Sequence, residues 1–152
     1  MVTGASGGVG SGVVQLCRAR GAIPYALVGA GKEAAVISIG AEATITRGEG
    51  DLSGAMAKLT NNEPIDVVVD TVSGPLLPDR IEILKPQGRY VTCGAMGGPM
   101  VEIGMRRIYL KNLELHGATQ GTRKDFEAVL NYVLSGNIKP LVAKIFALED
   151  LG

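Results

Sequence analysis

A glycine-dense turn near the start of the chain constrains the fold more than any other feature of the sequence. It reads Gly4-Ala5-Ser6-Gly7-Gly8-Val9-Gly10 and joins a short β-rich segment, residues 1–3, to an apolar helical pattern that ends at Gly21. Glycines let the chain turn sharply and let an anion reach the main chain, while the first amides of the following helix face that anion. This arrangement predicts a turn that binds the pyrophosphate of a dinucleotide.

The glycine pattern taken alone has an alternative interpretation, because Ala5 stands where the strict pattern has its first glycine. An ordinary glycine turn of an α/β domain would look the same over this stretch. The dinucleotide-binding interpretation is favoured by the strand before the turn and by the apolar helical face after it, formed by Val9, Val13, Val14, Leu16 and Cys17.

Composition excludes several classes of function. The chain has 152 residues, of which 46% are hydrophobic, and its 15 lysines and arginines balance 15 aspartates and glutamates. Such a chain can bury a core of its own, so we expect one domain, residues 1–152, without general attraction to nucleic acid or to an acidic membrane. No apolar run reaches membrane-spanning length and no signal-peptide pattern opens the chain, which indicates a soluble, cytoplasmic protein.

Metal binding and disulfide bonding are not indicated by the sequence. The two cysteines, Cys17 and Cys93, are too few for a disulfide framework, and the single histidine, His116, has no companions at metal-ligand spacing. We therefore expect this chain to bind no zinc.

Strands and helices alternate along the chain, which is typical of parallel β-α-β units. After residues 1–3, strands are expected at residues 23–28, 44–46, 65–70, 88–94 and 113–117. After the first helix, further helices are expected at residues 32–39, 52–59, 76–84 and 123–134. The β-branched run at residues 65–70 is interpreted as a central strand buried on both faces. The pattern predicts an α/β fold with a doubly wound parallel sheet of strand order 3-2-1-4-5-6.

Ligands of such sheets bind beyond the carboxyl ends of the strands, where the winding direction reverses. This rule brings together five turns, at residues 6–10, 28–31, 71–74, 93–96 and 118–121. Glycine in any one of them is usually turn chemistry alone. Their gathering at one edge of the sheet predicts a single ligand site.

Several stretches, in order along the chain, resemble one known family. They are residues 2–10, 15–16, 21–22 and 39–41, followed by Asp66-Val67-Val68-Val69-Asp70, Leu84-Lys85-Pro86-Gln87-Gly88-Arg89, residues 106–117 and Gly136-Asn137-Ile138-Lys139-Pro140. Together they resemble the cofactor domain of the medium-chain dehydrogenases and reductases, the zinc-type alcohol dehydrogenase and quinone oxidoreductase group. The resemblance covers essentially the whole chain and implies a Rossmann fold that binds a nicotinamide dinucleotide.

The same resemblance implies parts that this sequence does not contain. Family members carry an N-terminal catalytic domain, which holds the zinc ligands where zinc is used, and their chain returns to that domain after the cofactor domain. Residues 1–3 and 150–152, where a further helix begins, match the two borders of the cofactor domain. We therefore expect a fragment that is inactive alone, and a homodimer, since the family pairs its sixth strand across a two-fold axis.

The end of the second strand bears on the choice of cofactor. Specificity for NAD usually comes from an acid about 20 residues past the glycines, and Val28-Gly29-Ala30-Gly31 contains none. Lys32 follows at once and Arg47 lies just after the third strand, at positions that hold 2′-phosphate contacts in the quinone oxidoreductase branch. NADP is therefore favoured. NAD stays open, because both cations are also consistent with solvated surface charges beside Glu33 and Glu49.

The expected cofactor-binding residues come from these turns and from the two cations. They are Ser6, Gly7, Gly8, Val9, Gly10, Gly29, Lys32, Arg47, Asp70, Thr71, Val72, Cys93, Gly94, Ala95, Ala118 and Thr119. The resemblance implies adenosine near Asp70 and Thr71, and the nicotinamide ribose and carboxamide near residues 93–96 and 118–120. No catalytic residue is expected: Cys93 is interpreted as a small packed side chain and His116 as structural.

The sequence thus predicts the NADP(H)-binding domain of an oxidoreductase that transfers hydride between nicotinamide and a small-molecule substrate. That substrate is expected to be an alcohol or carbonyl compound, a quinone or an enone. The alternative is a stand-alone dinucleotide-binding or sensor module without catalysis. A site for S-adenosylmethionine is disfavoured because an acidic ribose clamp is absent.

Overall fold

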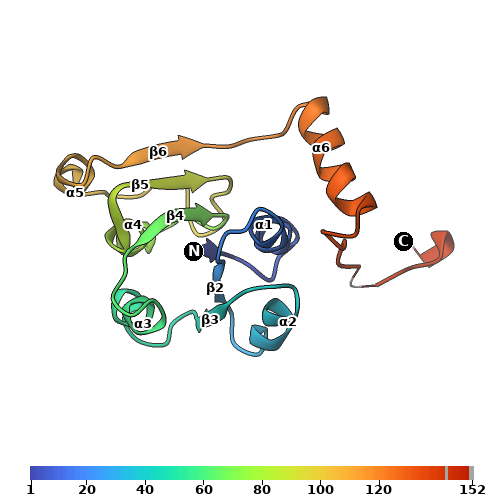
Figure 1. Ribbon diagram of the computed structural model, residues 1–152, viewed down its shortest axis with the longest axis horizontal. Helices are drawn as coiled ribbons and strands as arrows, with labels where there is room; N and C mark the ends of the chain where they lie inside the picture. Colours follow the sequence, from blue (N-terminus) through green and yellow to red (C-terminus); the bar gives the residue numbers. More distant parts are fainter. Residues whose placement is uncertain (143, 151–152) are drawn as a thin grey trace.

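A six-stranded parallel sheet runs through the centre of the molecule (Figure 1). The computed structural model describes residues 1–142 and 144–150. Its strands are β1 (Val2–Thr3), β2 (Tyr25–Val28), β3 (Ala43–Thr46), β4 (Ile65–Asp70), β5 (Leu84–Thr92) and β6 (Glu114–Gly117). Their order, β3-β2-β1-β4-β5-β6 with parallel pairing throughout, confirms the doubly wound α/β, or Rossmann, fold.

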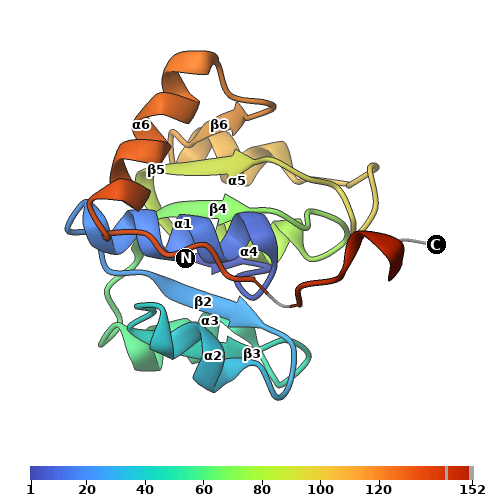
Figure 2. The ribbon, with the colours of Figure 1, turned by 90° about the vertical axis from the view of Figure 1, so that its right-hand side faces the viewer.

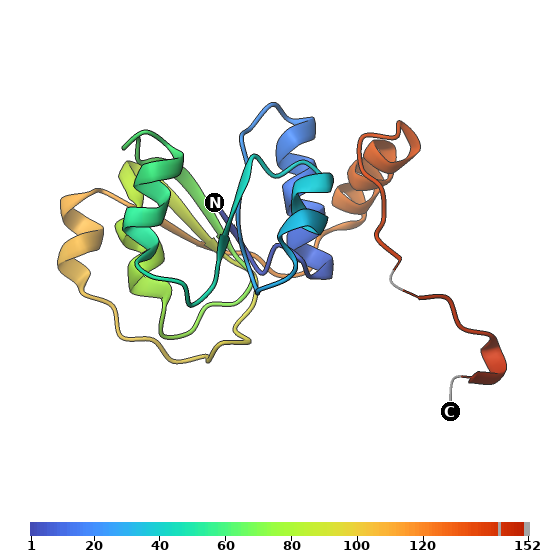
Figure 3. The same ribbon diagram turned by 90° about the horizontal axis from the view of Figure 1, so that it is seen from below.

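Helices cover both faces of this sheet. They are α1 (Gly8–Ala19), α2 (Glu33–Ser38), α3 (Leu52–Leu59), α4 (Leu77–Glu82), α5 (Met105–Leu110) and α6 (Arg123–Leu134), followed by a 3-10 turn, η1 (Leu148–Asp150). Helices α1, α2 and α6 lie on one side and α3, α4 and α5 on the other (Figure 3). The strands run in one direction (Figure 2), so their carboxyl ends gather at one edge. No helix within the described ranges combines the length and apolar character needed to cross a bilayer.

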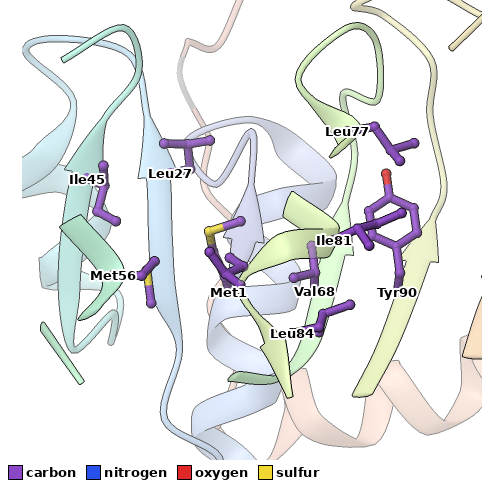
Figure 4. Packing of buried hydrophobic residues seen from close by; sticks show 10 residues of the cluster. Met1, Leu27, Ile45, Met56, Val68, Leu77, Ile81, Leu84 and Tyr90 are labelled. Carbon is purple, nitrogen blue, oxygen red and sulfur yellow. The ribbon is translucent and has the colours of Figure 1, made fainter. Parts of the chain in front are cut away.

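Two apolar clusters hold the helices against the sheet. On the α3 and α4 face, Met56 of α3 and Ile81 of α4 pack among strand residues that include Leu27 and Tyr90 (Figure 4). On the opposite face, the buried cluster contains Val14 of α1 and Val36 of α2 with Val2, Ala5, Ala26, Val28 and Ala41. Fully burying one large apolar side chain of this kind contributes about 1.5–3 kcal/mol, so α1, α2, α3 and α4 are held against the sheet by packing.

Side-chain caps explain why α3 and α6 begin at the residues that the sequence predicts. Asp51 accepts hydrogen bonds from the amides of Ser53 (3.2 Å) and Gly54 (2.8 Å) at the start of α3. At the start of α6, Thr122 and Asp125 bond reciprocally, with the Thr122 amide donating to Asp125 Oδ2 at 2.8 Å. Each cap satisfies amides that a helix leaves without an internal partner.

Strand β5 and helix α5 differ from the sequence-based expectation. The strand begins at Leu84, whereas the expected helix ran to that residue and the expected strand began at residue 88. An irregular stretch lengthens β5: Gln87 has a φ of 61°, and the β4–β5 register shifts between Ile65 and Val67. Proline is tolerated at such irregularities, so Pro86 ends no strand here. Helix α5 was not expected, because six residues show too little periodicity.

Burial also differs from expectation at two places. Strand β4 is not buried on both faces: Asp66 is exposed, and Val67 and Val69 are half-buried because they border an open cavity of about 460 Å³ beside β1. On α1, Val9 is 62% exposed, whereas Gly10 and Val14 face the sheet. The helix is therefore rotated relative to the apolar face expected from the sequence.

A close approach of two backbones accounts for that rotation. A Cβ atom on Gly10 would lie 2.2 Å from the carbonyl oxygen of Gly4 and 2.7 Å from Cα of Ala5. Only glycine fits at this distance, so the first turn of α1 rests directly on the turn that follows β1.

The segment after α6 is fixed to α1 by one side chain. Gln15, buried on α1, accepts a hydrogen bond from the Lys139 amide at 2.8 Å and donates one to the Lys139 carbonyl at 3.1 Å. The neighbouring Ile138 is buried as well. Beyond this contact, residues 140–142 and 144–150 extend away from the sheet (Figure 3), and the further helix expected from residue 150 falls on residues 151–152, outside the described ranges.

Replacing Gly10 by alanine is expected to lower the free energy of unfolding by about 1–3 kcal/mol, because the new methyl group forces α1 away from Gly4. Gly12, also in α1, is a matched control, since a Cβ there meets nothing within 4 Å. Gly12→Ala should raise the free energy of unfolding by about 0.5–1 kcal/mol through helix propensity. Urea denaturation of the two variants measures both changes, and equal stabilities would contradict the packing described.

Candidate functional site

A cavity of about 640 Å³ opens at the carboxyl ends of the strands. Four of the five turns expected to meet there line it, through residues that include Gly7, Gly29, Thr71 and Gly94. The fifth turn, residues 118–121, is absent from the lining, because it follows the edge strand β6 and leads away toward α6 (Figure 1). The volume lies within the range of about 300–1,000 Å³ that is usual for small-molecule sites.

Helix α1 begins at this cavity with free backbone amides. Gly7 is its N-cap, no side chain among the described residues caps it, and its first turn holds no acid. The Gly7 amide donates to the Gly4 carbonyl at 2.9 Å and the Ser11 amide to the Gly7 carbonyl at 2.9 Å. The amides of residues 8–10, between them, precede the first intrahelical hydrogen bond and can bind an anion. A Cβ on Gly8 would meet nothing within 4 Å, so the approach is open.

Two cations line the cavity beyond β2. Lys32 precedes α2 and Arg47 follows β3, and the parallel pairing of β2 with β3 brings them to one edge. The Arg47 amide donates to the Val28 carbonyl at 2.7 Å, which fixes the backbone of this arginine. Glu33, next to Lys32, is engaged elsewhere: its own backbone amide and the Thr46 hydroxyl, 2.9 Å away, lower the pKa of its carboxyl.

A buried carboxylate, Asp70, lies at the end of β4 next to the cavity-lining Thr71. It accepts hydrogen bonds from Thr3 Oγ1 (2.5 Å), Arg80 Nη1 (2.5 Å), Tyr90 Oη (2.6 Å) and the amides of Val72 and Ser73 (2.9 Å each). Burial by itself would raise the pKa of Asp70, but these hydrogen bonds outweigh burial and hold the pKa below its usual value. One carboxylate thus joins β1, β4, β5 and α4.

Most of the residues expected to bind a cofactor line the cavity. They are Ser6, Gly7, Gly8, Val9, Gly10, Gly29, Lys32, Arg47, Thr71, Val72, Cys93 and Gly94. Lining residues outside the expected set include Thr3, Gly4, Leu27, Arg80 and Gly97. Gly97 could have been found from its place in a glycine-containing turn, but nothing in the sequence around Arg80 points to the cavity.

Four expected residues are not part of the cavity lining: Asp70, Ala95, Ala118 and Thr119. The Asp70 side chain is fully buried and occupied by the hydrogen bonds given above. Ala118 and Thr119 are exposed and follow the edge strand. Their placement near a ligand stays a prediction.

Cys93 and His116, interpreted from the sequence as non-catalytic, lie in different surroundings. Burial raises the pKa of the Cys93 thiol, whose Sγ lies 3.7 Å from the Asp70 carbonyl oxygen, so it is a weak nucleophile. His116 is exposed on β6 and contacts Glu114 at 3.0 Å. Within residues 1–142 and 144–150, no three or more His, Cys, Asp and Glu side chains gather as a metal site would require.

A smaller cavity, of about 170 Å³, adjoins the first. It is lined mainly by the β3–α3 connection, residues 48–51, and by flanking side chains of β3 and α3. Leu27, Arg47 and Arg80 line both cavities and so form their common wall.

Comparison with known proteins identifies relatives that match almost the whole chain, including the residues around the cavity. The family model of the zinc-binding dehydrogenases matches residues 8–135. An acryloyl-coenzyme A reductase from Metallosphaera sedula is 31% identical over 153 residues, covering 99% of this chain and 44% of the relative. A NAD-dependent alcohol dehydrogenase from Sulfolobus acidocaldarius is 28% identical, with the same two coverages of 99% and 44%. The chain therefore spans less than half the length of these curated relatives.

Solved structures share the fold of this chain. A protein from Sinorhizobium meliloti assigned as an alcohol dehydrogenase matches with 55% identity and a TM-score of 0.89, over 92% of this chain and 39% of its own. The crotonyl-CoA carboxylase/reductase AntE, in complex with NADP, matches with 22% identity and a TM-score of 0.84, over 93% of this chain and 41% of its own. At that identity, the second match indicates a shared fold only.

Substituting Asp70 by asparagine is expected to lower the free energy of unfolding by about 3–5 kcal/mol at neutral pH, because it leaves the Arg80 charge buried without a partner. The pKa of Asp70 is lower in the folded protein than in the unfolded chain, so its stabilisation is present above the unfolded pKa of about 3.9. It is lost as the pH falls through the folded pKa. Urea denaturation from pH 7 to pH 3 should therefore show the difference between wild type and variant shrinking with acid.

Asp66→Asn is the matched control, since Asp66 lies on the same strand as Asp70 but forms an exposed ion pair, with Lys85 of β5. Exposed pairs contribute little, so this variant should unfold close to the wild type at every pH. A similar loss in both variants would show that the Asp70 network is not the cause.

Proposed function

This chain belongs to the zinc-binding dehydrogenase family of medium-chain oxidoreductases, and we propose that it binds NADP(H) for hydride transfer. The observation that carries the proposal is the uncapped start of α1, which opens on a cavity lined by glycines. The amides of residues 8–10 and the positive end of the helix dipole suit a pyrophosphate, and no acid in the first turn repels it.

Each part of the cavity is assigned one part of the cofactor. The α1 amides bind the pyrophosphate, and Lys32 and Arg47 bind the 2′-phosphate on the adenosine ribose. The loop after β5, residues 93–96, binds the nicotinamide end. Gly94 in that loop is required by space, because a Cβ there would lie 2.4 Å from the Thr71 carbonyl oxygen. When bound, the nicotinamide supplies or accepts the hydride, while this chain binds and orients it.

The substrate class follows from the relatives that the chain resembles. One is an acryloyl-coenzyme A reductase and another an alcohol dehydrogenase, so the proposed substrates are activated alkenes such as enones, and alcohols or carbonyl compounds. Quinones are a further candidate, because they accept hydride as enones and carbonyl compounds do. The relatives are more than twice as long as the matched region. We propose that substrate binding, and zinc where it is used, belong to a domain equivalent to the part of the relatives outside that region.

The chain by itself is therefore proposed to bind cofactor without turnover. Its described residues hold no metal-binding group and no paired general acid and base at the cavity to polarise a carbonyl. NADPH oxidation by the isolated chain with small aldehydes, quinones or enones would contradict this part of the proposal.

Lys32→Ala and Arg47→Ala are each expected to weaken NADPH binding roughly ten- to a hundredfold, the equivalent of losing one charged hydrogen bond of about 1.5–3 kcal/mol. Binding of NADH should barely change, because NADH lacks the 2′-phosphate. Isothermal titration calorimetry with both cofactors measures the two affinities for each variant.

Lys58→Ala serves as the control, since Lys58 is exposed on α3, lies outside both cavities and carries the same charge. It should leave both affinities unchanged. An equal loss of NADPH and NADH binding in the Lys32 and Arg47 variants would remove the argument for NADP.

A homodimer is proposed from the edge of the sheet. Strand β6 pairs with β5 on one side and is exposed along its length, including Leu115. An exposed strand edge can extend its sheet into a second copy across a two-fold axis. Light scattering over a dilution series should give twice the chain mass of 15.8 kDa, and a monomer at every concentration would contradict the proposal.

A further inference from the structure

One acidic side chain, Glu33, belongs to the same edge of the sheet as the two cations assigned to the 2′-phosphate. It directly follows Lys32 in the sequence, and its Oε1 accepts a hydrogen bond at 2.9 Å from the hydroxyl of Thr46, the residue before Arg47. Parallel pairing of Val28 with Thr46 brings the two segments together. A carboxylate here has the wrong charge for a phosphate site, so its orientation bears on cofactor binding.

The Glu33 carboxylate is charged but is hydrogen-bonded to neutral groups. Backbone amides at the start of α2, its own first among them, and the Thr46 hydroxyl lower the pKa of this carboxyl, so it is ionised at neutral pH. Lys32 and Arg47 are exposed, and neither takes part in an ion pair within residues 1–142 and 144–150. The acid beside the two cations therefore does not neutralise them.

We propose that Thr46 is a positioning residue for cofactor selection: its hydroxyl holds the Glu33 carboxylate away from Lys32 and Arg47, which leaves both cations to bind the 2′-phosphate of NADP(H). This inference rests on the proposed function, because it assumes that the two cations contact that phosphate. Without the hydroxyl, the carboxylate can pair with a neighbouring cation, and the phosphate then has to displace an exposed ion pair.

NADH responds differently to the same release of Glu33. It carries a ribose hydroxyl where NADPH carries the phosphate, and a carboxylate accepts a hydrogen bond from such a hydroxyl. Releasing the carboxylate therefore opposes the binding of NADPH but not that of NADH. The hydrogen bond from Thr46 thus acts on the choice between the two cofactors.

Thr46→Val tests the inference, because valine keeps the branched shape of threonine and suits a strand but has no hydroxyl. NADPH binding is expected to weaken roughly two- to fivefold, the equivalent of one exposed ion pair, and NADH binding should not weaken. Thr46→Ser keeps a hydroxyl and should bind NADPH as the wild type does. Isothermal titration calorimetry with both cofactors measures these affinities. Thr46→Ala gives the same test if the valine variant does not fold.

Glu33→Gln shows whether Thr46 acts through the carboxylate. In the Glu33→Gln background, adding Thr46→Val should no longer weaken NADPH binding, since no charge remains to be released. In the Glu49→Gln background the loss should persist, because Glu49, another acid at this edge of the sheet, accepts no hydrogen bond from Thr46 Oγ1. The comparison separates the effect of Glu33 from a general change in local charge.

Thr44→Val is the matched control, because Thr44 is half-buried on β3 like Thr46 but lines neither cavity. It should leave both affinities unchanged. Unchanged NADPH binding in the Thr46→Val variant, an equal loss of NADPH and NADH, or a loss that survives in the Glu33→Gln background would each overturn the inference. A wild type that binds neither cofactor, or binds NADPH no more tightly than NADH, would instead refute the proposed function.

Discussion

The backbone contact between Gly10 and Gly4 is the constraint on which the rest of the site depends. A side chain at residue 10 would overlap the Gly4 carbonyl, and its absence lets α1 lie against the turn after β1. That approach buries Val14 and Ala5 together and directs the first amides of α1 into the cavity. Packing and ligand binding therefore share one geometric requirement, met by a residue without a side chain.

The Asp70 network gives the cavity a rigid base. Its carboxylate connects strands β1, β4 and β5 with helix α4, so the turns that leave those strands are fixed relative to one another. Holding two charges away from water is costly unless each is paired and hydrogen-bonded. Here the arrangement fixes the positions of Thr71 and Arg80, which both line the cavity.

Sequence patterns predicted the parts of the fold that local chemistry determines. The expected ranges of α3 and α6 match the structure, which shows local N-terminal caps at both helices, Asp51 and the Thr122–Asp125 pair. The glycine turn was likewise predicted from its own residues. The start of β5 was misjudged because Leu84 pairs with Ile65 ahead of the irregular stretch that contains Pro86 and Gln87, and only the tertiary pairing shows this. Arg80 was missed for a similar reason, since only the fold brings a mid-helix arginine beneath Asp70. Residues that act through tertiary contacts leave no local pattern.

The contact between Gln15 and Lys139 has a consequence for how the chain assembles. The two residues are separated by 124 positions, and all of strands β2 to β6 lie between them in the sequence. Closing so long a loop is entropically unfavourable until the intervening strands have paired, because their pairing brings the two ends together beforehand. We therefore expect this contact to form late in folding, after the sheet has brought α1 and the segment around Lys139 together.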